Sequence, residues 1–267
     1  MRIEPGQVAV VTGGASGIGY GLAAGLGSRG VKIVLADIRQ AGLIEATTAL
    51  TALGVEVLGV VTDVGDPESV AHLADSTMGH FGRVDIVCNN AGVVGAQAPM
   101  WEQQPQTWQW LINIKLMGVV HGVTTFAPLL LQHGTGHFLN TASAGGLMPL
   151  PTMTPYNATM HAVVGLTETL NLELRAVAPG VGASVLCPGR VATGLGTNSQ
   201  ALEPSVGAAA TGNPQDLAGS VLDPAELAEL TVAGIAADAV HIVAGAGVAA
   251  GAQARMDSLL RDLDLGA

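Results

Sequence analysis

Residues 8–19 read VAVVTGGASGIG, an apolar run followed by closely spaced glycines. The run predicts a buried strand, and the residues after Gly17 have the apolar spacing of a helix. In such a strand–turn–helix unit, glycines let the backbone approach a pyrophosphate, and the amides of the helix N-terminus bind its negative charge. Gly13, Gly17 and Gly19 are therefore candidate phosphate-binding residues, with simple tight-turn glycines as the alternative.

Two further features favour a dinucleotide site. Asp37 follows a second apolar run, eighteen residues after Gly19, where a carboxylate accepts hydrogen bonds from ribose hydroxyls. A later apolar run ends at Cys88 and is followed by Asn89-Asn90-Ala91-Gly92. That point is where the strand order of a doubly wound sheet would reverse and form a ligand crevice. The sequence therefore predicts dinucleotide binding at the carboxyl ends of these strands.

The whole chain alternates short apolar runs with longer helical patterns. The predicted strands are Val8–Val11, Lys32–Ala36, Val55–Val61, Asp85–Cys88, His137–Asn140, Ala183–Leu186 and Val240–Val243. The predicted helices are Gly17–Arg29, Leu43–Leu53, Pro67–Phe81, Gln106–Leu131 and Pro155–Ala178. This alternation predicts the α/β class, a single Rossmann-type doubly wound parallel sheet of about seven strands with helices on both faces. No linker divides the pattern, so residues 1–267 are expected to form one domain.

Two segments fall outside the alternation. Residues 188–222 are rich in Gly, Ala, Ser, Thr and Asn. So long an irregular stretch is usually a substrate-binding loop or lid, with a disordered excursion as the alternative. Residues 249–263 have helical spacing and predict a C-terminal helix with one apolar side, formed by Ala252, Met256, Leu259, Leu260 and Leu263.

Composition excludes several classes of protein. Apolar residues make up 49% of the 267-residue chain, which argues against disorder. A net charge of −11 and only two lysines, Lys32 and Lys115, argue against a nucleic-acid partner. Cys88 and Cys187 lie in apolar runs and are expected to be buried thiols rather than a disulfide. The N-terminus lacks a signal-peptide pattern, and no uninterrupted apolar run is long enough to span a membrane, so we expect a soluble cytoplasmic protein with no membrane segment. The histidines lack the spacing of metal ligands, so no metal is expected.

With these motifs in this order, the chain resembles the short-chain dehydrogenase/reductase family from Val8 to about Val243. Thr12–Gly19 is similar to the family's TGxxxGIG, and Asn89–Gly92 to its NNAG. Asp63-Val64 matches the pair that contacts adenine, and the segment from Pro188 to Thr193 matches the one that holds the nicotinamide carboxamide. The resemblance implies NAD as cofactor, NADP being less favoured. The residues implied to bind it are Gly13, Ser16, Gly17, Ile18, Gly19, Asp37, Asp63, Val64, Asn90, Ala91, Gly92, Tyr156, Pro188, Gly189, Val191 and Thr193.

The family transfers a hydride between nicotinamide and a carbinol or carbonyl carbon. A tyrosine exchanges the proton, a serine hydrogen-bonds the oxygen, and a lysine and an asparagine complete a relay. The resemblance assigns these roles to Tyr156, to Ser143 thirteen residues earlier, and to Asn113 as relay support. It implies an NAD-dependent alcohol dehydrogenase/ketone reductase, and the apolar segment Leu147–Met153 suggests a hydrophobic secondary alcohol or ketone as substrate.

The lysine of the family's Tyr-x-x-x-Lys is missing, because residue 160 is methionine. Free tyrosine titrates near pKa 10 and needs nearby positive charge to act as a base at neutral pH. If a lysine supplies about two to three pKa units, its loss lowers the rate by about 10²–10³. On regular helical geometry His161 points away from the Tyr156 face, and Lys115, two residues after Asn113, lies off the Asn113 face, so neither is a convincing substitute.

Two accounts of Met160 fit the sequence. The chain is either a natural variant with weak or altered chemistry, or one whose lysine was replaced deliberately to arrest turnover. The lack of a compensating base favours the second account. The alternative function is a catalytically weak or inactive NAD-binding sensor or scaffold protein.

Two predicted helices carry more apolar residues than one buried face requires. In Gln106–Leu131 and Pro155–Ala178 these are Val119, Val120, Val123, Phe126, Val163, Val164, Leu166 and Leu170. In the family such helices pair across a two-fold axis, so a homodimer or homotetramer is expected.

Overall fold

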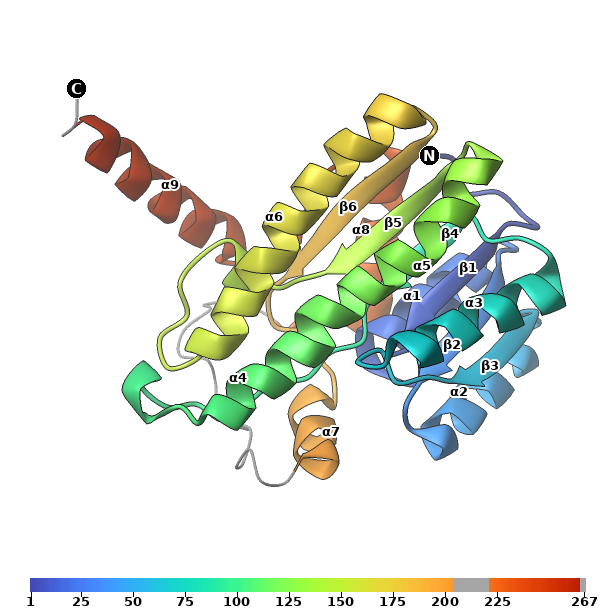
Figure 1. The fold of residues 1–267 in the computed structure, drawn as a ribbon, viewed down its shortest axis with the longest axis horizontal. Coiled ribbons are helices and arrows are strands. Elements are labelled where there is room, and N and C mark those ends of the chain that lie inside the picture. The colour runs from blue at the N-terminus through green and yellow to red at the C-terminus, as the bar shows by residue number, and fades with distance from the viewer. Residues whose placement is uncertain (204–220, 265–267) are drawn as a thin grey trace.

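The computed structural model describes residues 1–203 and 221–264 of the chain. Its strands form one parallel sheet in the order β3-β2-β1-β4-β5-β6-β7 (Figure 1). The strands are β1 (Val8–Thr12), β2 (Lys32–Asp37), β3 (Val57–Val61), β4 (Ile86–Asn89), β5 (Gly136–Thr141), β6 (Val181–Pro188) and β7 (His241–Ala244). The order reverses between β1 and β4, which opens a crevice at the carboxyl ends of these two strands.

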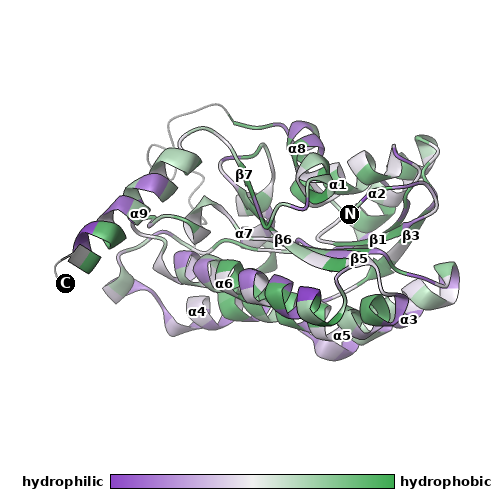
Figure 2. Cartoon of the chain, turned by 90° about the horizontal axis from the view of Figure 1, so that it is seen from above, coloured by the Kyte–Doolittle hydropathy of each residue, from purple (hydrophilic) through white to green (hydrophobic). Residues whose placement is uncertain are grey.

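Helices cover both faces of the sheet, which Figure 2 shows edge-on between two helical layers. One layer contains α1 (Gly17–Gly27), α2 (Gln40–Ala52) and α8 (Pro224–Ala236). The other contains α3 (Pro67–Phe81), α5 (Gly118–His133) and α6 (Thr154–Val177). The predicted fold class is therefore confirmed.

Strand β1 shows why its apolar run is continuous. Ala9 and Val11 pack in the core that contains Leu22 of α1, whereas Val8 and Val10 pack in the opposite core, with Phe126 of α5. These four apolar residues of β1 are fully buried. A strand buried on both faces has no solvent-facing position for a polar side chain, which is typical of parallel sheets.

A continuous helical stretch, Pro105–His133, leads from the pocket region along the sheet. It consists of α4 (Pro105–Leu111), a π-helical turn η2 (Ile112–Met117) and α5. By length and composition this stretch could cross a membrane, since an 18-residue window within it has a mean hydropathy of 1.5. It is the one such helix among the residues that the structure describes. Its residues Leu111, Phe126 and Leu130 are nevertheless buried, as in a helix that packs on a sheet.

Two predicted segments outside the alternation are partly described. Residues 204–220 of the predicted 188–222 loop lie outside the described residues. The described part contains a helix that the sequence did not predict, α7 (Leu195–Leu202), and Val191 pairs with Leu222 at the base of the loop. The predicted C-terminal helix is present as α9 (Val248–Asp264), and it extends away from the rest of the molecule (Figures 1 and 2).

Helix α8 was not among the predicted helices either. It begins after Asp223, whose carboxylate caps its N-terminus by accepting a hydrogen bond from Ala225 N. Two short 3₁₀ turns, η1 (Met100–Glu102) and η3 (Ala144–Gly146), complete the described elements. The expectation of one domain over residues 1–267 stays a prediction.

Candidate active site

One cavity of about 700 Å³ lies at the carboxyl ends of the strands. That volume is within the usual range of about 300–1,000 Å³ for ligand pockets. Of the predicted site residues, it is lined by Gly13, Ser16, Gly17, Ile18, Asp37, Asp63, Val64, Asn90, Ala91, Gly92, Asn113, Ser143, Tyr156, Pro188, Gly189, Val191 and Thr193. Gly19 and Met160 are not on its wall. Within residues 1–203 and 221–264, no cluster of three or more metal-ligating side chains occurs.

The turn after β1 forms a cradle that only glycine permits. Gly13 has a φ of +64°, and a Cβ there would lie 2.8 Å from the Cα of Ala91. The hydroxyl of Thr12 accepts hydrogen bonds from the amides of Asn90 at 2.9 Å and Ala91 at 3.0 Å, so the turn is tied to the end of β4. Gly19 packs behind this turn, against the carbonyl of Gly13. The open cradle at the N-terminus of α1 fits a pyrophosphate.

At the end of β2, Asp37 is held among donors. Its carboxylate accepts hydrogen bonds from the amide of Ala15 at 3.1 Å and from the amide and Nε of Arg39 at 3.0 and 3.3 Å. The Arg39 guanidinium also donates to Ser16 Oγ at 2.9 Å. A carboxylate that binds ribose hydroxyls and a guanidinium that could bind a phosphate therefore lie side by side at this end of the cavity.

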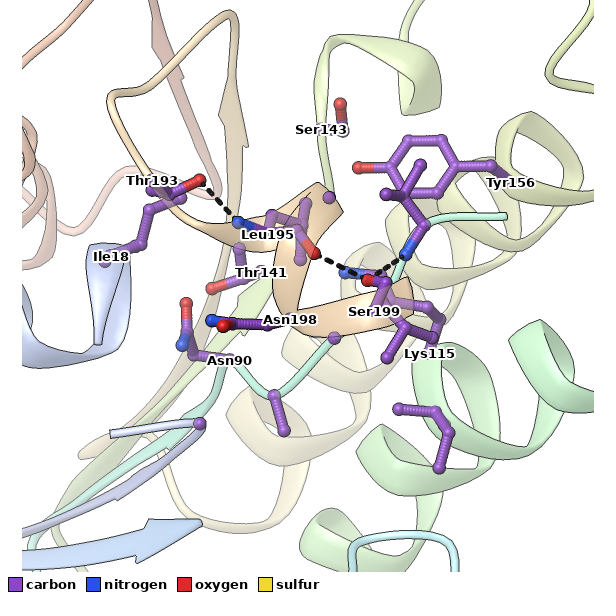
Figure 3. A pocket seen from close by; sticks show the side chains of 18 of the residues that line it. Ile18, Asn90, Lys115, Thr141, Ser143, Tyr156, Thr193, Leu195, Asn198 and Ser199 are labelled. Atoms are coloured by element: carbon purple, nitrogen blue, oxygen red, sulfur yellow. Dashed lines mark hydrogen bonds between the residues drawn. The ribbon is translucent and has the colours of Figure 1, made fainter. Parts of the chain in front are cut away.

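Ser143 and Tyr156 lie together at the other end of the cavity (Figure 3). Ser143 follows β5 and caps η3, accepting a hydrogen bond from the amide of Gly145 at 3.3 Å. Tyr156 lies in the first turn of α6. Burial raises the pKa of the Tyr156 phenol above its usual value, and a hydrogen bond with Ser143 offsets part of that rise. The pair is arranged to bind one oxygen atom, but the phenol needs positive charge to give up its proton.

The loop between Ser143 and Tyr156 is held in place by Asn157. The Asn157 amide nitrogen donates to the carbonyls of Gly145 and Met148, and its oxygen accepts from the amide of Leu150 at 2.9 Å. His161, one turn further along α6, bonds back to the carbonyl of Asn157. Sequence reasoning missed this clamp, because its partners are backbone groups with no sequence signature.

Met160 is fully buried behind the cavity wall. Its side chain belongs to the apolar cluster that includes Val163, Val185 and Cys187. A thioether in these surroundings offers neither a charge nor a donor to the cavity.

The π-helical turn η2 decides which side chains approach Tyr156. Asn113 reaches the cavity wall, but its amide lies against Gly65, after β3, and no hydrogen bond joins it to Ser143 or Tyr156 in the described chain. Its assigned relay role stays a prediction. Lys115 is instead the cation beside the phenol, with Nζ over the Tyr156 ring and 5.8 Å from its centroid (Figure 3).

Lys115 does lie off the face of Asn113, as expected, but the conclusion that it therefore cannot approach the catalytic residues is wrong. That conclusion assumed regular helical geometry, whereas a π turn contains an extra residue and changes the face that each side chain occupies. The argument for a deliberate replacement of the lysine rested on the lack of any substitute, and it loses that support. The sequence did contain a signal, since Lys115 is one of only two lysines and is surrounded by apolar residues.

Helix α7 closes over the cavity and was also missed. Ser199 is buried, accepts a hydrogen bond from the amide of Val94 at 3.0 Å and donates to the carbonyl of Leu195 at 2.7 Å. Asn198 donates to Ser16 Oγ at 3.4 Å. These contacts join the described part of the predicted lid to both ends of the cavity.

Comparison with known proteins agrees with this geometry. A family model described as short chain dehydrogenase matches residues 7–203. The chain belongs to the short-chain dehydrogenase family. Curated proteins that are similar to this short-chain dehydrogenase include the 1-deoxy-11-beta-hydroxypentalenate dehydrogenase of Streptomyces avermitilis, which is 39% identical over 72% of this chain and 71% of its own. Matching proteins are named as dehydrogenases and reductases, so the chain is an oxidoreductase of this family.

Solved structures with this fold hold different cofactors. A short-chain dehydrogenase/reductase from Burkholderia phymatum in complex with NAD is 37% identical, with a TM-score of 0.88 over 99% of this chain and 97% of that chain. An alcohol dehydrogenase from the archaeon Thermococcus sibiricus, complexed with 5-hydroxy-NADP, is 26% identical, with a TM-score of 0.76 over 91% of this chain and 97% of that one. Cofactor preference therefore has to be argued from the residues of this chain.

Proposed function

We propose that this short-chain dehydrogenase transfers a hydride between NAD(H) and a hydrophobic secondary alcohol or the corresponding ketone. The proposal rests on one observation, that three groups of residues line the same cavity. These are the glycine cradle at Gly13, the carboxylate of Asp37, and the pair Ser143 and Tyr156 at the opposite end.

The residues have separate chemical tasks. A nicotinamide dinucleotide, when bound by the cradle and Asp37, supplies the hydride acceptor or donor. Ser143 donates a hydrogen bond to the substrate oxygen and holds it beside the phenol. In the oxidation direction Tyr156 accepts the alcohol proton as the carbinol C–H bond breaks, and in the reduction direction it protonates the ketone oxygen.

The cavity wall favours an apolar substrate. Its apolar lining residues include Leu195 and Leu202 of α7 and four residues that pack in the cluster containing Tyr156, namely Val94, Trp110, Leu150 and Met153. Such a surface stabilises an alkyl or aromatic substituent by burial but offers few partners to a second polar group. This supports a hydrophobic secondary alcohol or ketone rather than a sugar or an acid.

NAD is the proposed cofactor because Asp37 is buried and would repel a 2′-phosphate. Arg39 is the residue that could bind the 2′-phosphate of NADP, but its guanidinium is already bound to Asp37 and to Ser16. We expect NAD to bind at least about tenfold more tightly than NADP, a difference of about 1.4 kcal/mol.

The decisive experiment is a turnover assay with NAD⁺ and a panel of hydrophobic secondary alcohols, and with NADH and the matching ketones. Tyr156→Phe should abolish turnover and Ser143→Ala should lower kcat by about 10²-fold, while both variants still bind NAD in calorimetry. Tight NAD binding without turnover of any alcohol or ketone would replace this proposal with the sensor or scaffold function.

We also propose that the protein is a homodimer or homotetramer in the cytoplasm. Val119, Phe126, Val163 and Val164 are buried in the chain's own core, so they are not surplus as the sequence suggested. Half-buried residues remain along a shallow groove between α5 and α6, namely Val120, Val123, Leu166 and Leu170. Pairing of this face across a two-fold axis would cover them. Cys88 and Cys187 are both free and buried, which suits a reducing compartment.

A further inference from the structure

Lys115 is a buried cation with no anionic partner in the described chain. Its side chain is 5% exposed, and no ion pair or hydrogen bond joins its Nζ to a residue in the ranges 1–203 and 221–264. Burial without compensation lowers the pKa of Lys115 to about 8. A fold that places a lysine in such surroundings loses stability, so its position calls for a functional explanation.

Gly92 leaves the room that the Lys115 side chain needs to reach the cavity. A Cβ at Gly92 would lie 2.5 Å from Lys115 Nζ and 2.8 Å from its Cδ, so any other residue at position 92 would displace the side chain. The amine lines the cavity and lies over the Tyr156 ring, 5.8 Å from its centroid. That distance is within the range of about 6 Å in which a cation and an aromatic ring attract each other.

Among the residues that the structure describes, the titratable groups near η2 are uncharged, exposed or bonded elsewhere. The neighbouring Cys187 thiol stays protonated, because burial raises its pKa to about 12. On α5, His121 bonds to the carbonyl of Val64, and His133 bonds to the hydroxyl of Thr135 at the far end of the helix. On α6, His161 bonds to Asn157, and Glu168 and Arg175 are paired with His241 and Asp238. Glu173 is exposed, and α4 carries no titratable side chain.

We propose that Lys115, presented from the π-helical turn, supplies Tyr156 with the amine that Met160 cannot supply. Lys115 acts through the phenol and is therefore a positioning residue for its proton. When an alcohol is oxidised, its O–H proton passes to the Tyr156 phenolate that the Lys115 ammonium stabilises, and the carbinol hydride leaves with both electrons of the C–H bond to the nicotinamide of the proposed function. When a ketone is reduced, the phenol gives its proton to the ketone oxygen, and the ammonium stabilises the phenolate that remains. The hydride steps rest on the proposed function, whereas the pairing of Lys115 with Tyr156 does not.

The pairing can be measured without cofactor or substrate. The chain has two tyrosines, so in a Tyr20→Phe background the tyrosinate absorbance reports Tyr156 alone. If the phenol and the amine titrate as a coupled pair, tyrosinate forms beside a retained ammonium, and Lys115→Met should shift the onset of that absorbance upward by about one to two pH units. Lys32→Met, which removes the other lysine, should leave the curve unchanged. Identical curves for the Lys115→Met protein and its parent would overturn the proposal.

Kinetic measurements distinguish the effect of an amine at position 115 from that of an amine at position 160. Lys115→Met should lower kcat at neutral pH by about 10²–10³, with KM changed less than about threefold, and should move the alkaline limb of the pH profile upward. Met160→Lys should then bring kcat back to within about tenfold of the parent. In the parent, which already has the amine, Met160→Lys should change kcat less than about tenfold. A gain of about 10²–10³ in the parent would mean that Lys115 does not serve Tyr156.

Failure of the proposed function and failure of the role of Lys115 give different results in these experiments. If the titration shows coupling but no variant oxidises an alcohol or reduces a ketone, the pairing stands and the proposed function fails. If turnover is present and Lys115→Met alters neither kcat nor the titration, the proposed function stands and the role of Lys115 fails.

Discussion

Replacement of Lys115 by methionine should stabilise the folded protein while it removes activity. Burial lowers the pKa of Lys115 from 10.5 to about 8, and that difference corresponds to about 3 kcal/mol. Because the folded-state pKa is the lower one, the unfolded chain binds the proton more tightly. The penalty is therefore fully present below pH 8 and disappears as the pH rises toward 10.5. Methionine fills a similar volume without the charge.

Urea unfolding, followed by the fluorescence of the three tryptophans, measures this effect. At pH 7 the free energy of unfolding of Lys115→Met should exceed that of the parent by up to about 3 kcal/mol, or about 6–12 °C in Tm for a chain of this size. At pH 10 most of the difference should be gone. Lys32→Met is the matched control, because Lys32 forms an exposed ion pair with Glu56 and should change stability by less than about 1 kcal/mol. An equal gain at both pH values would refute the assignment of the effect to a buried charge.

Further predictions concern other described residues. Burial lowers the pKa of His137 from 6.5 to about 4, so stability should fall by about 3 kcal/mol as the pH drops through that range, and His137→Gln should remove the slope in urea titrations. Asp37→Ala should weaken NAD binding at least about tenfold and abolish the preference over NADP, as measured by calorimetry. Ser199→Ala, which frees α7 from the amide of Val94, should raise KM up to about tenfold with a smaller change in kcat. Leu170→Glu should give a monomer in light scattering.

The α/β alternation and the dinucleotide end could be predicted from the sequence because both depend on local signals. A strand buried on both faces requires an unbroken apolar run, as at Val8–Val11. A glycine such as Gly13 marks a turn that other residues cannot form. Ser143 and Tyr156 are also brought together as their spacing suggests, since one short loop joins β5 to α6.

Helix α7 and the Asn157 clamp could be found only in the tertiary structure. Ser199 and Asn157 bond mainly to backbone groups, and any segment of the chain can present such groups. Nothing in the residues around Ser199 therefore indicates that it meets Val94, which is 105 positions away.

The amino-acid sequence by itself predicted that a tyrosine and a serine would share one cavity and determined that position 160 would carry no charge. Which amine lies beside the phenol instead was decided only by the tertiary structure. Periodicity predicts a side chain's direction only while the helical repeat is regular, and the π turn at Ile112–Met117 breaks the repeat just before Lys115 reaches the cavity. The packing of that turn against α6 and Gly92, rather than the local sequence, directs the amine to Tyr156.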